Sequence, residues 1–111
     1  MDRHKPLEEK LKAAQTPIER TDALNTVSKQ QSEGDTKRAL ECASEAFDLA
    51  TRIQYETGTL DALLNLAWCS HCHSDYLKSI EYVTRALPLA RRDEHARQEA
   101  DAINILGNNH E

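Results

Sequence analysis

The chain has 111 residues and a formal net charge of −5, with 14 Lys and Arg against 19 Asp and Glu. This length fits one domain with one core. The acidic balance argues against nucleic acid and anionic membranes as main partners. Glycine and proline are scarce, with three of each, and Ala, Glu, Lys, Leu and Arg dominate, so we expect an all-α fold.

Hydropathy and cysteine content indicate a compartment. No window approaches the roughly 18 apolar residues that a transmembrane helix needs. The first six residues, MDRHKP, contain no apolar core of a signal peptide. The cysteines are odd in number, and Cys69 and Cys72 lie three apart, which favours reduced thiols over a disulfide framework. We therefore expect a cytoplasmic protein with no membrane partner.

The first predicted helix pair follows a leading segment. Residues 1–15 are expected to form a tail or a short leading helix over 7–14. A capping box at residues 16–19, with Pro17 at the first helical position, predicts a helix to about Gln31. Gly34 and Asp35 predict a break and a new cap, and an alanine-rich stripe predicts a second helix to Ile53. Residues 57–59, Thr-Gly-Thr, are expected to end it and start the next helix.

Three further helices are predicted after this turn. Apolar residues from Leu60 to Ser70 predict the third helix, and residues 74–75, Ser-Asp, predict a turn after it. The fourth helix carries a stripe over residues 80–90, and Pro88 is expected to kink or end it locally. Asp93 is expected to cap a fifth helix that extends to Asn109. No segment predicts a strand.

Internal repeats organise these helices. Asp-Ala-Leu or Asp-Ala-Ile occurs at residues 22–24, 61–63 and 101–103, at separations of 39 and 40. A fixed offset of 40 also aligns Asn25 with Asn65 and Asp35 with Asp75. The chain is therefore predicted to be a repeat protein of antiparallel helix pairs, over residues 17–56, 57–93 and, in part, 94–111.

The residues around each turn resemble the tetratricopeptide repeat. Residues 65–67, Asn-Leu-Ala, precede 74–76, Ser-Asp-Tyr, and small residues then punctuate the next helix at the spacing of that family. Residues 34–36, Gly-Asp-Thr, and 105–107, Ile-Leu-Gly, match the same pattern. The resemblance covers residues 17–111 and implies a right-handed superhelical solenoid, a tetratricopeptide-like domain over 16–111, with about two and a half repeats.

The resemblance also implies a function. The period of 40 exceeds the roughly 34 residues of the usual repeat. It is similar to the long repeats that precede a diguanylate cyclase or another output domain in bacterial signalling proteins. We therefore expect a protein-interaction module, the N-terminal sensory or docking region of a larger regulator, which binds a peptide or a protein and changes the position of the output domain.

The family's first helices line a concave groove that holds peptides or partner helices. Carried over to this chain, the groove positions are Thr21, Leu24, Asn25, Ser28, Gln31, Leu64, Asn65, Trp68, His71, Cys72, Asp101, Asn104 and Asn108. The Lys and Arg clamp that binds C-terminal carboxylates in this family is not evident here. Asn25 and Asn65 either contact a peptide or form a hydrogen bond between helices. Trp68 is either an interface anchor or packs against a neighbouring repeat.

Two alternatives come from other features. Cys69, Cys72 and His73 have the spacing that shares one helix face, and thiolate with imidazole suits Zn or Cu. A fourth ligand would have to come from Cys42, His95 or His110. The competing interpretation is a buried cysteine with solvated histidines.

Open repeat ends could instead pair two copies of the chain into a homodimer. Catalysis is not predicted, because paired carboxylates lie at helix starts and no Gly-rich loop offers an oxyanion site, and no cofactor is expected.

Overall fold

The computed structural model describes residues 9, 11–92 and 96–110, with only the backbone of residues 92, 96–97 and 108–110. Its helices are α2 (Pro17–Gln31), α3 (Thr36–Arg52), α4 (Glu56–Cys72), α5 (Tyr76–Arg92) and α6 (Ala96–His110). The described ranges contain no strand, which confirms the all-α prediction. Of the predicted leading helix, residues 11–13 are helical, and most of the remainder, like the predicted cap at Asp93, lies outside the described residues.

The predicted caps of the first two helices are confirmed. The Thr16 hydroxyl accepts a hydrogen bond from the Glu19 amide at 3.1 Å, and Pro17 is the first helical residue. The Glu19 carboxylate accepts from the Gln15 amide at 2.9 Å, one residue before the cap. Asp35 caps α3 by accepting from the Arg38 amide at 3.1 Å. Each cap pairs a donor that the helix itself leaves unsatisfied.

The turn predicted at residues 57–59 is wrong. The chain turns at residues 53–55 instead, with Gln54 in the left-handed region at φ 57°. The Ile53 amide donates to Leu49 O and the Tyr55 amide to Ala50 O, which satisfies the last carbonyls of α3. Ser74, at φ 61°, makes the same turn after α4. Because these bonds offset the left-handed strain at a non-glycine residue, the chain needs no glycine here, and Gly58 lies inside α4.

Pro88 does not end its helix, contrary to one of the two predicted outcomes. The α5 helix continues through it to Arg92. Proline lacks an amide hydrogen, so the carbonyl four residues earlier, at Thr84, loses its helical donor. Thr84 and Pro88 are both exposed, which leaves that carbonyl on the side of the helix that water reaches.

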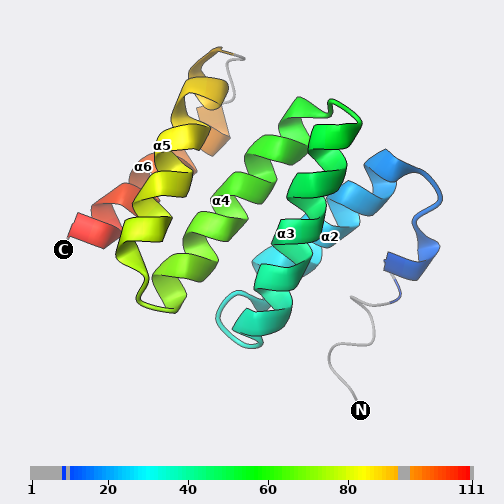
Figure 1. The fold of residues 1–111 in the computed structure, drawn as a ribbon, viewed down its shortest axis with the longest axis horizontal. Helices are drawn as coiled ribbons and strands as arrows, with labels where there is room; N and C mark the ends of the chain where they lie inside the picture. Colours follow the sequence, from blue (N-terminus) through cyan, green and yellow to red (C-terminus); the bar gives the residue numbers. More distant parts are fainter. Residues whose placement is uncertain (1–8, 10, 93–95, 111) are drawn as a thin grey trace.

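Consecutive helices pack in an antiparallel succession (Figure 1). In addition, α4 contacts both α2 and α6, so these three helices form one row, and α3 and α5 lie in front of α2 and α6 in the view of Figure 1. The described part of the chain contains no helix with the length and apolar character of a membrane span.

Small residues let the helices approach closely. Ala39, Ala43, Ala46 and Ala50 of α3 are fully buried, as are Ser79, Val83, Ala86 and Ala90 of α5. The hydroxyl of Ser28 donates to Ala39 O at 2.7 Å, and that of Ser79 donates to Ala67 O at 2.8 Å. Each bond ties a row helix to its partner, as the predicted close approach requires.

The first residues of the three row helices show how their positions correspond. The first residues of α2 and α4 are 39 apart, and those of α4 and α6 are 40 apart. In this register Leu24, Leu63 and Ile103 are equivalent. Leu24 and Leu63 are each 2% exposed beneath α3 and α5, whereas Ile103 is 51% exposed. The α6 helix therefore exposes an apolar position whose equivalents in α2 and α4 are buried.

Candidate functional site

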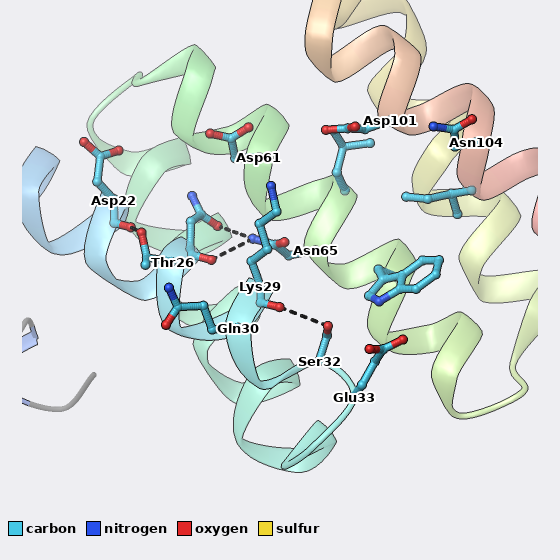
Figure 2. Close-up of a pocket in the computed structure, with 14 residues that line it drawn as sticks. Asp22, Thr26, Lys29, Gln30, Ser32, Glu33, Asp61, Asn65, Asp101 and Asn104 are labelled. Carbon is cyan, nitrogen blue, oxygen red and sulfur yellow. Dashed lines mark hydrogen bonds between the residues drawn. The ribbon is translucent and has the colours of Figure 1, made fainter. Parts of the chain in front are cut away.

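One side of the helix row is hollowed into a cavity of about 870 Å³ (Figure 2). Its walls come from α2, the turn after α2, α4 and α6. The lining residues are Asp22, Asn25, Thr26, Lys29, Gln30, Ser32, Glu33, Asp61, Leu64, Asn65, Trp68, Asp101, Asn104 and Ile105. This volume is within the usual range for ligand sites, so the cavity is the candidate site.

The lining repeats from helix to helix. Asp22, Asp61 and Asp101 are equivalent in the 39 and 40 register, and Figure 2 shows them in a row along one side of the cavity. The next two equivalent sets also line it, namely Asn25, Leu64 and Asn104, then Thr26, Asn65 and Ile105. Each row helix thus contributes the same turn of its surface, spaced by three and four residues.

Six of the predicted groove residues line this cavity: Asn25, Leu64, Asn65, Trp68, Asp101 and Asn104. The remaining lining residues were not predicted. Asp22 and Asp61 had a signal in the repeated Asp-Ala-Leu motif, which was used only to find the repeats. Glu33 and Ser32 had none, because they lie in the turn after α2 and reach the cavity through the tertiary fold.

Four predicted groove positions are wrong, since their side chains are buried and do not line the cavity. Thr21, Leu24, Ser28 and Gln31 are between 0% and 6% exposed. Leu24 packs in an apolar cluster with Val27 and Cys42, and Ser28 bonds to α3. Neighbouring residues on a helix differ by about 100° in direction, so a one-residue error moves a side chain from the cavity to the core.

Two further predicted positions lie outside the lining, and one is not described. His71 is half-buried and stacks on Trp68 instead, and Cys72 is exposed but is not among the lining residues. The side chain of Asn108 lies outside the described residues.

Asn25 and Asn65 join α2 to α4. The Asn25 amide nitrogen donates to Gly58 O at 3.2 Å, and the Asn65 amide nitrogen donates to the Asn25 side-chain oxygen at 3.1 Å and to Asn25 O at 3.2 Å. The predicted hydrogen bond between helices is therefore confirmed. The predicted equivalence of the two asparagines is wrong, because the 39-residue register pairs Asn25 with Leu64.

Charge in the cavity is mostly negative. Four lining residues carry carboxylates, and Lys29 is the one lining cation among the described residues. Tyr55 donates its hydroxyl to Asp22 Oδ1 at 2.8 Å, and Gln98 donates to Asp61 Oδ1 at 3.3 Å. Burial, then the hydrogen bond and charge of Asp22, raise the pKa of Tyr55 to about 12.

Trp68 has both of its predicted environments. It is half-buried, packs against the apolar cluster of α4, α5 and α6, and also lines the cavity. Its ring stacks on His71 with centroids 5.2 Å apart, and His71 contacts Tyr76 at 5.4 Å. These contacts restrict the indole to one orientation, which lowers the entropy lost when a ligand covers it.

The predicted alternative at Cys69, Cys72 and His73 is not supported by their placement. Cys69 is buried, whereas Cys72 and His73 are exposed. Burial raises the pKa of the Cys69 thiol to about 11, and desolvation followed by the charge of Glu33 raises that of Cys72. Metal binding needs thiolates, which raised pKa values disfavour. Among the described residues, no three His, Cys, Asp or Glu side chains are placed to hold a metal ion.

Comparisons of the chain with protein families, with curated proteins and with solved structures found no match.

Proposed function

We propose that the chain is a tetratricopeptide-like solenoid that binds a protein or peptide segment in the cavity and performs no catalysis. The observation that carries this proposal is the repeated lining: equivalent positions of α2, α4 and α6 face one cavity. A surface built from repeated units offers a ligand the same contacts at regular intervals, which suits a chain-like ligand.

The chemistry of the lining supports a binding role. Leu64 and Trp68 supply apolar surface, and Asn104 and Thr26 supply polar groups. Trp is enriched among the residues that dominate binding energy at interfaces. We propose that such a module works in the cytoplasm as the N-terminal docking or sensory region of a larger regulator, such as a diguanylate cyclase, and that partner binding repositions the output domain.

The test is selection of a random 12-residue peptide library on the full chain, followed by titration of synthetic binders. Binding is read from the fluorescence of Trp68, the only tryptophan. Trp68→Ala, followed with labelled peptide, and Asn104→Tyr, which places a bulky ring in the cavity, are each expected to weaken binding at least about tenfold. Leu77→Ala, at a position 84% exposed and outside the cavity, is the matched control and should bind as wild type does.

Circular dichroism of each variant separates lost binding from lost folding. Because Trp68 also packs in the core, Asn104→Tyr is the decisive variant: it removes no core contact. The proposal fails if the library yields no binders, or if binders tolerate Asn104→Tyr.

The exposed face of α6 favours a second candidate function, self-association. Ile103 is 51% exposed, while its equivalents Leu24 and Leu63 are buried. At Gly107, equivalent to the fully buried Ala67, an added methyl group would meet no atom of the described residues within 4 Å beyond its own stretch of helix. A second copy that packed its own α6 there would bury this apolar surface by a self-complementary contact.

Sedimentation velocity at rising protein concentration tests this second function. We expect the wild-type mass to rise toward that of a dimer and Ile103→Glu to remain monomeric, because a charge cannot be buried there unpaired. Leu77→Glu places the same charge at an exposed leucine of α5 and should still dimerise. A wild-type mass that stays monomeric at all concentrations excludes self-association.

A further inference from the structure

We infer that the segment bound in the cavity is cationic, with Lys or Arg side chains spaced to meet the row of aspartates. This inference rests on the proposed docking function and adds the chemistry of its ligand. A cationic ligand differs from the peptides that tetratricopeptide domains with a Lys and Arg clamp bind by their C-terminal carboxylate. The carboxylates of this cavity would repel such a terminus, because like charges that face each other disfavour binding.

The charges that carry this inference come from separate elements. Asp22, Asp61 and Asp101 extend from three helices, and Glu33 extends from the turn after α2. Among the described lining residues, Lys29 is the only one with a positive charge. The cavity walls therefore hold three net negative charges. A concave surface lined by one sign of charge concentrates ligands of the opposite sign.

The four carboxylates differ in their hydrogen bonds to the rest of the protein. Asp22 accepts from Tyr55, and Asp61 accepts from Gln98 of the following row helix. Asp101 belongs to the last described row helix, and no described residue bonds or pairs with its carboxylate. Glu33 is exposed and has no ion pair among the described residues. Asp101 and Glu33 are thus the carboxylates best able to receive a cation from a ligand.

The spacing of the row limits the ligand. Packed helices lie about 8–10 Å apart, so we expect a similar distance between neighbouring aspartates. An extended polyproline-type segment advances about 9 Å in three residues and a helix about 10.5 Å in seven. Cations at one of these two intervals would meet successive aspartates. Trp68 offers an aromatic face, to which Lys and Arg are also attracted.

Lys29 provides an internal check on this inference. Figure 2 shows its side chain extended over the cavity with its ammonium directed toward the side where Asp61 and Asp101 lie. It is exposed and lies among the groups that a ligand cation would meet. If the ligand is cationic, Lys29 repels it, and Lys29→Gln should tighten binding about two- to fivefold. A variant that merely damaged the fold would not bind more tightly.

The experiment uses the library selection described above and reads the composition of the binders. We expect Lys and Arg to be enriched over the unselected pool, with recurrence at three or seven residues. A synthetic binder is then titrated into Glu33→Gln/Asp101→Asn, for which we expect at least about tenfold weaker binding, and the wild-type affinity should fall as salt rises. The matched control is Asp48→Asn/Glu81→Gln, which removes the same net charge at exposed positions outside the cavity.

The outcomes separate the inference from the docking function. Binders that need an open cavity but lack Lys and Arg enrichment would overturn the cationic ligand and leave docking intact. Equal weakening by the control pair would also overturn it, because the attraction would then come from the overall charge of the chain. A library that yields no binders overturns both.

Discussion

Gly58→Ala is expected to lower the free energy of unfolding by about 1–3 kcal/mol, although alanine is the better helix former. An added Cβ would lie 2.7 Å from the buried Cγ2 of Thr21 and 2.6 Å from Cδ2 of the Tyr55 ring. Neither neighbour is free to move: Thr21 is enclosed between helices, and the Tyr55 hydroxyl donates to Asp22. Urea unfolding followed by circular dichroism measures the change.

Gly107→Ala is the matched control, since it makes the same substitution inside α6. An added methyl group there meets no atom from another part of the described chain within 4 Å. We therefore expect a gain of about 0.4–1 kcal/mol from the reduced entropy of the unfolded chain. Opposite signs for the two variants would establish close helix approach at Gly58; a stabilised Gly58→Ala protein would contradict it.

Burial of Tyr55 and its hydrogen bond to Asp22 make the stability of the fold depend on pH. The pKa of Tyr55 is raised from 10.0 to about 12 in the folded protein. The folded chain therefore keeps a proton that the unfolded chain loses, and this contribution to stability is complete below pH 10 and lost between about pH 10 and 12. Displacing the ring in Gly58→Ala should return that pKa toward 10.

Local signals predicted α2 and α3 well because each begins with its own side-chain cap. Thr16 and Asp35 are short-range features: a side-chain oxygen and the amides it pairs lie within three residues. The misplaced turn shows the limit of this reasoning. Gln54 adopts a left-handed conformation that favours glycine, and the bonds that the amides of residues 53–55 donate back to α3 stabilise it there.

The cavity was harder to predict than the helices because the row helices are packed on more than one side. Leu63 and Leu64 of α4 are both buried, one beneath α5 and the other at the cavity wall. A helix with apolar residues all round has no polar face from which to infer its rotation. A fixed offset of 40 then shifted α2 positions by one residue, and this made the buried Ser28 a groove residue in place of Lys29, the equivalent of Trp68 that does line the cavity.

The repeats differ at one position in a way that has a large expected effect. Where α4 carries Leu64, α2 carries Asn25, which is 7% exposed and bonded to both Gly58 and Asn65. Asn25→Ala is expected to lower the free energy of unfolding by about 2–3 kcal/mol. The loss arises because the buried Gly58 carbonyl keeps no side-chain donor and Asn65 loses one acceptor. Urea unfolding measures it.

A double-mutant cycle with Asn65→Ala assigns this loss to the pair. Since each single variant already breaks the bond between the two side chains, the double variant should cost about 1 kcal/mol less than the sum of the singles. Asn104→Ala, an exposed asparagine of α6 that lines the same cavity, should change stability by no more than about 0.5 kcal/mol. If Asn25→Ala proves as mild as Asn104→Ala, the asparagines do not hold α2 to α4, and the position of α2 at the cavity wall must depend on its other contacts.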